Sequence, residues 1–244
     1  MSGSERFNLY TQIHKGLRAC MSEVLVRVGR LDPHDSADIK TAAADVRGLI
    51  EFARDHLRHE EEWIHPALEA RRAGSSAESR AEHEQHLETF ELLESSLRIL
   101  ERSQEQERST AALRLYRQLA LFVAENFEHM HVEETKNHGV LVALYSEQEI
   151  LDLHARLVAS VTPAAMSVAL RWMIPASSAP ERAAVLGGMQ QAAPAPVFAA
   201  MLDIIRPYLD ARDWAKLGAA IGPMPQEFSS PRAAPAEARI ALAA

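Results

Sequence analysis

Apolar residues recur about every 3.6 positions along the first 145 residues of the chain, where glycine is scarce. This pattern is typical of amphipathic helices, and no segment shows the alternation of a convincing β-strand. Pro66 should bend one helix, and Ser75 with Glu78 has capping-box spacing at the start of the next. Short connections favour antiparallel neighbours, so the expected fold is all-α, an up-down-up-down four-helix bundle. The four long helices are predicted over residues 7–30, 36–72, 76–103 and 107–145.

The apolar segments beyond the bundle are shorter, and 10 of the 12 prolines of the chain lie at or after Pro163. Helix starts with capping residues are predicted there at Ser146, Thr162 and Ser178. The last residues are rich in proline, alanine and serine, a composition typical of disorder. The expected organisation is a bundle over 1–146, a smaller all-α unit over 147–222 and a disordered tail over 223–244.

Two segments of the predicted second and fourth helices repeat each other, DHLRHEEEWIHPAL and EHMHVEETKNHGVL. When His56 is laid on His129, Glu60 falls on Glu133. Each histidine therefore precedes a glutamate by four residues. On a helix this spacing leaves the two side chains about 40° apart around the axis and about 6 Å apart along it. Each helix can thus present both groups to one metal site.

These ionisable residues lie on apolar helix faces. Burying an imidazole or carboxylate without a partner costs several kcal/mol, so an exposed ion-paired face and a bound metal are the two sensible interpretations, and the apolar flanks favour metal. The first and third helices add His14 and His83, each within an apolar series. One such histidine is usually a core residue, but one on each of four successive helices indicates a site. The candidate ligands are His14, His56, Glu60, His83, His129 and Glu133.

The order of these residues resembles the hemerythrin-like (HHE) family, whose four-helix bundles hold a non-haem di-iron centre. The resemblance covers about the first 145 residues and rests on the doubled His-x-x-x-Glu with a histidine before each copy. It implies that the histidines bind two iron ions and that Glu60 and Glu133 bridge them, together with an oxo or hydroxo group. It also implies open coordination for dioxygen, nitric oxide, peroxide or a small anion. The donor types alone suit iron, manganese or zinc, and only the resemblance selects iron.

Two further residues leave the ligand set open. His86 follows His83 by three residues and shares its core-facing side, so it is a candidate fifth histidine, as in the oxygen-carrying hemerythrins. Tyr10 lies one turn before His14 and either approaches the metals or packs as a core aromatic residue.

Two patterns bear on the type of di-iron protein. The oxygen carriers place an aspartate five residues after the last histidine, whereas this chain has Glu133 at four and Glu134 at five, which argues against reversible oxygen carriage. A ferritin-like site is an alternative, because its carboxylate and histidine ligands stand three residues apart. The pairs with that spacing are Glu62 with His65 and Glu128 with His131, but they fall at different positions of the repeat.

The composition of the chain restricts its possible partners and cellular compartment. The net charge of −8 and the lack of a Lys/Arg cluster argue against nucleic-acid binding. A single cysteine, Cys20, excludes an internal disulfide, and no segment has the length and apolar character of a membrane span or signal peptide, so we expect a cytoplasmic protein. Its expected function is to bind or sense dioxygen, nitric oxide, peroxide or iron level; a di-iron oxidoreductase acting on oxygen, peroxide or nitric oxide is the alternative. The C-terminal helices are expected to mediate self-association or bind a protein partner.

Overall fold

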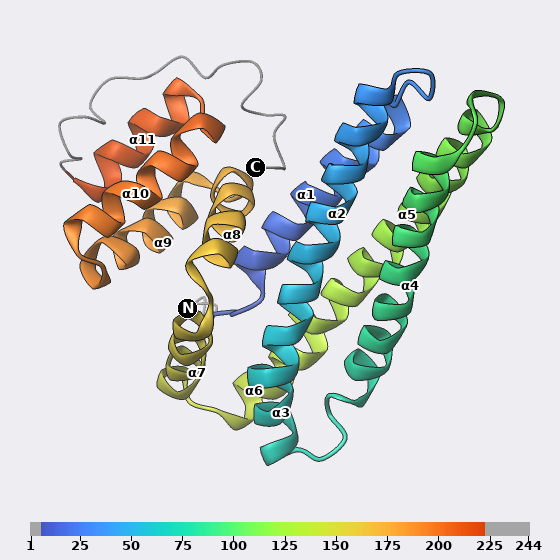
Figure 1. Ribbon diagram of the computed structural model, residues 1–244. Helices are drawn as coiled ribbons and strands as arrows, with labels where there is room; N and C mark the ends of the chain where they lie inside the picture. Colours follow the sequence, from blue (N-terminus) through green and yellow to red (C-terminus); the bar gives the residue numbers. More distant parts are fainter. Residues whose placement is uncertain (1–5, 223–244) are drawn as a thin grey trace.

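The computed structural model describes residues 6–222, and this part of the chain is helical with no strand (Figure 1). The predicted disordered tail over 223–244 lies outside the described residues. The helices are α1 (Thr11–Arg30), α2 (Ser36–His59), α3 (His65–Arg71), α4 (Ala77–Arg102), α5 (Glu105–Val132), α6 (His138–Leu144), α7 (Glu147–Ser160), α8 (Pro163–Ala176), α9 (Ala179–Ala192), α10 (Ala195–Ile205) and α11 (Ala211–Ile221), with the π-helical turns η1 (Glu60–Ile64) and η2 (Glu133–Asn137) and the 3-10 turn η3 (Arg206–Tyr208).

The predicted four-helix bundle is present. Its four rods are α1, α2 continued by α3, α4, and α5 continued by α6 (Figure 1). Both α1 and α4 pack against α2 and against α5, so α1 and α4 lie diagonally opposite each other. The two rods that carry the His-x-x-x-Glu repeat, α2 and α5, occupy the other diagonal.

Each repeated segment contains a π-helical turn at the same position. The backbone N–H of His65 donates to the carbonyl of Glu60, and that of His138 donates to the carbonyl of Glu133, which widens the helix by one residue at each glutamate. We expected Pro66 to bend the first copy, but the second copy has Gly139 at the equivalent position and the same turn. Proline is therefore not the cause of the break. Single π turns are rare in helices and occur frequently at functional sites.

The helix ends confirm some sequence predictions and correct one. Ser146 forms the predicted capping box with Glu149, and Thr162 caps α8 through the N–H of Ala165. The predicted box of Ser75 with Glu78 is wrong. Instead, the carboxylate of Glu69 accepts hydrogen bonds from the N–H of Gly74 and from both the N–H and the hydroxyl of Ser76. A carboxylate from the preceding helix thus orders the turn that a local serine was expected to cap.

Two apolar layers enclose the middle of the bundle. The larger core runs toward the α1–α2 and α4–α5 connections and includes Leu17, Cys20, Met21, Leu49, Phe90, Leu97, Leu115 and Phe122. A smaller core at the other end includes Tyr10, Ile64, Leu68, Leu141, Ile150 and Leu153. Burying a large apolar side chain contributes about 1.5–3 kcal/mol, so both layers hold the rods in register. His14 and Glu60 lie between the two layers along their helices.

The C-terminal helices are anchored on the bundle by α8, which packs along α1 (Figure 1). A Cβ added to Gly16 of α1 would lie 3.0 Å from the backbone N and Cα of Met173, so glycine is required for this close approach. Trp172 enters the bundle core, whereas Leu170 and Ile174 enter a separate core shared with α9, α10 and α11.

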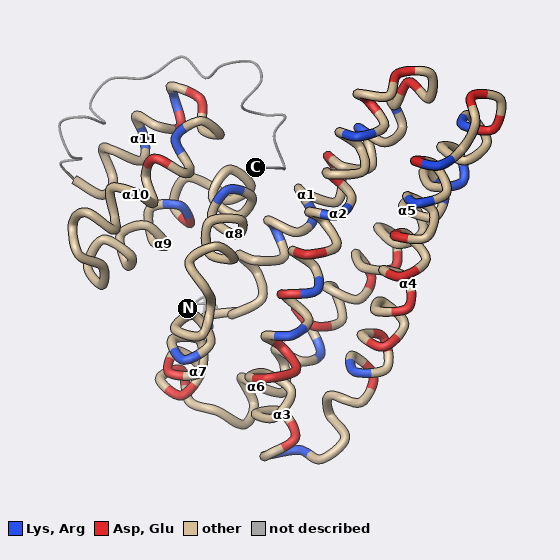
Figure 2. The backbone as a smooth tube through the Cα atoms, in the orientation of Figure 1, with Lys and Arg blue, Asp and Glu red and all other residues tan. Residues whose placement is uncertain are grey.

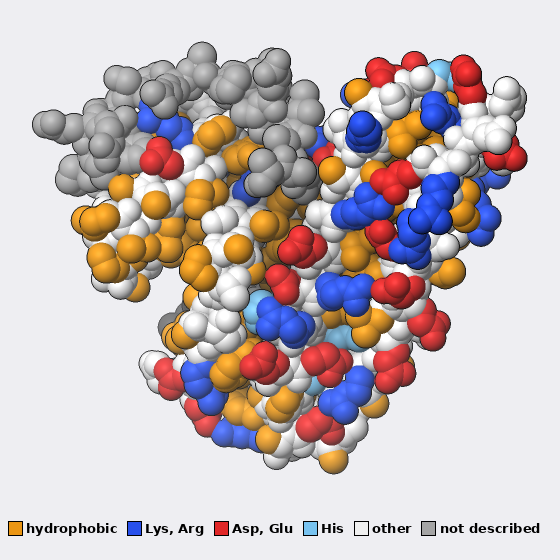
Figure 3. Space-filling model, in the orientation of Figure 1, with side chains coloured by type: hydrophobic (Ala, Val, Ile, Leu, Met, Phe, Trp, Pro, Cys, Tyr) orange, Lys and Arg blue, Asp and Glu red, His pale blue; other side chains and the backbone are white. Residues whose placement is uncertain are grey.

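Charged residues of both signs are interleaved along the bundle helices (Figure 2), whereas hydrophobic side chains gather over α9 and α10 on the face shown in Figure 3. Within residues 6–222, no single helix has the length and apolar character needed to cross a membrane. In this part of the chain, α7 and α8 are the one helix pair that reaches that apolar length together, and they are bent by 118° relative to each other.

Candidate metal centre

The structure brings all six predicted ligands together in the middle of the bundle. Their donor atoms form two groups of four, each within 4.8 Å of one another. All six residues are buried. Glu60 and Glu133 belong to both groups, which are His14, His56, Glu60 and Glu133, and Glu60, His83, His129 and Glu133.

The first group joins α1 to the end of α2. Nε2 of His14 lies 3.1 Å from Nε2 of His56, although the two residues are 42 positions apart. Oε1 of Glu60 lies 3.2 Å from Nε2 of His56, and Oε2 of Glu133 lies 3.4 Å from Nε2 of His14. Four donor atoms from three of the four rods therefore lie within 4.8 Å of one another.

The second group repeats this arrangement between α4 and α5. Nε2 of His83 lies 3.1 Å from Nε2 of His129. Oε2 of Glu60 lies 3.4 Å from Nε2 of His83, and Oε2 of Glu133 lies 3.3 Å from Nε2 of His129. Glu60 thus directs one carboxylate oxygen to each group, and Glu133 lies between the two pairs of histidines.

The donor set fits a pair of metal ions. Both carboxylate oxygens of Glu60 and of Glu133 are buried, and none has a hydrogen-bond partner among the described residues. An uncompensated buried carboxylate costs far more than a neutral polar group. Two ligands at a right angle on metal bonds of about 2.1 Å are separated by about 3 Å, close to the observed Nε2–Nε2 distances. Imidazole and carboxylate donors suit iron, manganese or zinc.

Outer carboxylates orient three of the four histidines. The Nδ1 atom of His14 lies 3.1 Å from Oε1 of Glu134, which also accepts a hydrogen bond from Arg18 at 2.6 Å. The Nδ1 atom of His83 lies 3.0 Å from Oε1 of Glu61. A carboxylate on one ring nitrogen fixes the tautomer and makes the other nitrogen the metal ligand. In both cases the partner is the glutamate that follows a candidate bridging glutamate.

The third outer carboxylate, Glu82, was not identified from the sequence. Its Oε2 lies 2.6 Å from Nδ1 of His129 on the neighbouring helix. The only feature of the sequence that could have pointed to Glu82 is its position directly before His83. The equivalent residue before His14 is Ile13, which has no hydrogen-bonding side chain. The two halves of the centre therefore have the same kinds of ligand, but only the half with His83 and His129 has a glutamate at this position.

Two histidines of the centre have a raised pKa and two have a lowered pKa when no cation is bound. Burial opposes the charged form of His14 and His83, but the carboxylates beside their rings outweigh burial and raise the pKa to about 9 for His14 and about 10 for His83. Burial lowers the pKa of both His56 and His86 to about 3. Burial and the nearby charge of Glu60 also raise the pKa of Glu133. Metal binding must therefore displace protons from two of the histidines.

His86 and Tyr10 lie beside the centre. His86 is outside both four-residue groups, and its ring packs edge-on against that of His129, with centroids 4.9 Å apart. Tyr10 is fully buried, and its ring centroid is 5.4 Å from that of His14. Burial and the charges of Glu133 and Glu60 raise the pKa of the Tyr10 hydroxyl well above its usual value. Tyr10 thus packs as a core residue, and the charges of Glu60 and Glu133 act on its hydroxyl.

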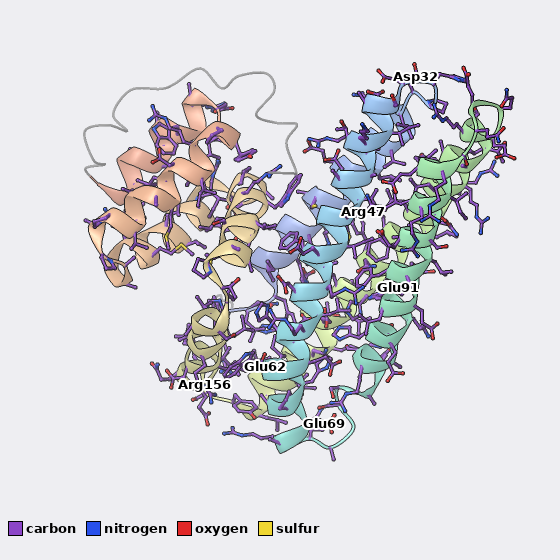
Figure 4. All side chains as sticks on the ribbon, in the orientation of Figure 1. Asp32, Arg47, Glu62, Glu69, Glu91 and Arg156 are labelled. Atoms are coloured by element: carbon purple, nitrogen blue, oxygen red, sulfur yellow. The ribbon has the colours of Figure 1, made fainter. Side chains whose placement is uncertain are left out.

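The ferritin-like pairs do not form a second centre. Glu62 is half-exposed on the outside of the bundle (Figure 4), and both Glu128 and His131 are exposed. His65 is buried, but it stacks on His83 and joins a smaller group with Glu61. The two pairs therefore do not converge on one site.

Comparison with known proteins agrees with this geometry. The family model of the hemerythrin HHE cation binding domain matches residues 7–141, which is more than half of the chain. The matched region contains all six predicted ligands. No curated protein and no solved structure matches the chain. The family model and the buried His/Glu groups lead to one conclusion: the chain belongs to the hemerythrin HHE cation-binding domain family.

Proposed function

We propose that this protein holds two iron ions between the two groups of ligands and uses them to bind or sense dioxygen, nitric oxide, peroxide or iron level. The observation that carries this proposal is the sharing of Glu60 and Glu133 by both four-residue groups. A carboxylate that points one oxygen at each of two histidine pairs is suited to bridge two cations. Iron is preferred over manganese or zinc because of the family to which the chain belongs.

The residues of the chain have distinct roles in this proposal. His14, His56, His83 and His129 supply neutral Nε2 donors. Glu61, Glu82 and Glu134 hold the opposite ring nitrogens and keep the donors aimed inward. The apolar layers on either side exclude water. The iron pair, when bound, supplies reversible change of oxidation state and open positions for a small ligand.

The C-terminal helices are well placed to report the state of the centre. Gly16, where α8 packs most closely on α1, is two residues from His14. A small displacement of α1 at His14 would therefore move α8, because the two helices are in close contact at Gly16. We propose that α8 to α11 bind a protein partner or a second copy of the chain in response to the metal centre.

A di-iron oxidoreductase acting on oxygen, peroxide or nitric oxide is the second candidate function. One observation favours it: a cavity between the bundle and the C-terminal helices reaches His56 and Glu60. A sensor for a diatomic ligand does not require such a space, whereas an enzyme with an organic co-substrate does.

The test is elemental analysis and an ultraviolet-visible spectrum of the purified full-length protein, in air and after reduction. We expect about two iron ions per chain, one for each ligand group, and absorption that changes with oxidation state. His56→Ala and Glu133→Ala should each remove much of the iron. Full iron content in a variant lacking His14, His56, His83 and His129 together would disprove the proposal. Turnover of peroxide or nitric oxide by the loaded protein would favour the enzyme over the sensor.

A further inference from the structure

A cavity of about 340 Å³ lies between the bundle and the C-terminal helices. Its walls come from the segment preceding α1, the start of α1, the second half of α2 with η1, and α7, α8 and α9. The volume is within the range of sites that bind small molecules, roughly 300–1,000 Å³. Two parts of the chain that are distant in sequence thus complete one internal space.

The cavity reaches only one half of the metal centre. Of the six candidate ligands, His56 and Glu60 line it, and the other four do not. His56 belongs only to the group that also contains His14, whereas Glu60 is shared by both groups. On the opposite side of the centre, His86 packs edge-on against Phe122, with ring centroids 6.2 Å apart. A molecule in the cavity would therefore lie beside one metal position and away from the other.

Most of the wall is apolar. Aromatic and aliphatic side chains come from every contributing element, including Phe7, Phe52, Leu157, Val161, Met166 and Val185. Such a surface favours a ligand that is mainly hydrocarbon, because transfer of apolar area from water is the dominant gain on binding.

The charged groups of the wall are already engaged or exposed. Asp55 pairs with Arg58 at 3.1 Å, and Glu51 is exposed to solvent. The guanidinium of Arg171 lies over the ring of Tyr208, 5.1 Å from its centroid, and its buried Nε atom has no hydrogen-bond partner among the described residues. Apart from Glu60, which the metal centre would use, no charged side chain of the described wall is fully buried, and Arg171 is half-buried.

His154 supplies a neutral polar group. Its ring packs edge-on against Phe7, with centroids 5.0 Å apart, and burial lowers its pKa. It therefore stays uncharged at neutral pH and is able to exchange a hydrogen bond with an uncharged polar group.

We propose that this cavity binds a small uncharged organic molecule of mainly hydrocarbon character, beside the metal position that includes His56. Its use as a co-substrate or effector of the metal pair rests on the proposed function, but the binding itself depends only on the cavity. The C-terminal helices α7 to α9 are then part of a ligand site and not only a platform for partners.

The first test compares ligand charge at constant chain length. Isothermal titration calorimetry of the full-length protein as purified, at pH 7.5, would use 1-octanol and octanoate. We expect saturable binding of 1-octanol, with octanoate at least tenfold weaker because its carboxylate would be desolvated without a buried partner. No binding of 1-octanol would overturn the proposal, as would equal or tighter binding of octanoate.

The second test fills the cavity. Ala165 of α8 lines it, whereas Ala184 of α9 is exposed and does not. We expect Ala165→Phe to weaken 1-octanol binding at least tenfold and the matched Ala184→Phe to leave it unchanged. Unchanged affinity in Ala165→Phe, or an equal loss in both variants, would contradict the assignment of the site. If Ala165→Phe does not fold, the comparison of octanol with octanoate still decides.

Iron content measured on the same samples separates the two proposals. Octanol binding without iron would overturn the proposed function and leave the cavity site intact. Two iron ions per chain without octanol binding would overturn the cavity site and leave the proposed function intact.

Discussion

The Nε2 atoms of His14 and His56 face each other at 3.1 Å across the interface of α1 and α2. The Nδ1 atom of His14 is held by Glu134, so Nε2, which faces His56, is the ring nitrogen that can bind a metal ion. His83 and His129 repeat the same Nε2 separation across α4 and α5. Two imidazole nitrogens this close, with carboxylate oxygens beside them, form a set of ligands suited to one shared cation.

Metal removal should destabilise the protein strongly. Without a cation, the carboxylates of Glu60 and Glu133 remain buried together, with histidine Nε2 atoms 3.2–3.4 Å away, and burial and the charge of Glu60 raise the pKa of Glu133. A cation at 100 times its dissociation constant stabilises the fold by about 2.7 kcal/mol, because it binds the folded arrangement only. Thermal melts followed by circular dichroism, before and after chelation, should show a clearly lower melting temperature for the metal-free protein. Equal melting temperatures would mean that the centre does not bind metal or does not couple to folding.

Metal binding at pH 7 should release about two protons per chain, one from each protonated histidine. Burial opposes the charge on His14 and His83, but their carboxylate partners raise the pKa to about 9 and about 10, so both are protonated before the metal binds. Calorimetric titration with ferrous ion under anaerobic conditions, in phosphate and in Tris, measures the release through the different ionisation heats of the buffers. Identical heats in the two buffers would contradict this prediction.

Loss of an outer carboxylate should weaken metal binding without removing a ligand. Glu134→Gln leaves His14 with a weaker partner for Nδ1 and breaks the ion pair with Arg18. We expect about a 10- to 100-fold loss of metal affinity, the usual effect of such a change. The matched control is Glu78→Gln, which breaks an exposed ion pair with Lys136 and should leave affinity unchanged. Equal affinities of the two variants would show that Glu134 has no positioning role.

Acid should destabilise the metal-free protein through its buried neutral histidines. Burial lowers the pKa of His86 to about 3, whereas the unfolded chain titrates near its usual value of about 6.5. The unfolded state therefore binds the proton first, and stability is lost as the pH falls from about 6.5 toward 3. His86→Leu should reduce this dependence by up to about 1.4 kcal/mol per pH unit, measured by urea unfolding at pH 6, 5 and 4. Parallel curves for the two proteins would contradict it.

The α1–α8 contact should depend on the absence of a side chain at Gly16. A methyl group there would lie 3.0 Å from the backbone of Met173, so Gly16→Ala should cost about 1–3 kcal/mol or separate α8 from the bundle. Gly139→Ala is the matched control, because nothing lies within 4 Å of its added Cβ and alanine favours the helix by about 1 kcal/mol. Urea unfolding should therefore shift in opposite directions in the two variants. Stabilisation by Gly16→Ala would refute the close packing of α8.

The sequence by itself determined the helices of the bundle and the identity of the metal-site candidates. Apolar periodicity depends on residues three and four positions apart, so it can be read locally, and the repeat of His56 with Glu60 and His129 with Glu133 makes the inward faces visible in the same way.

Only the tertiary structure decided how the centre is supported and where it opens. Glu82 contacts His129 from another helix, and Glu134 contacts His14 across 120 positions of the chain. The spacing of residues along one helix therefore predicts neither contact. The cap by Glu69 and the seating of Met173 on Gly16 are of the same kind. Each depends on the distance and angle between packed helices. That geometry is set by the summed burial of many side chains rather than by any short stretch of sequence.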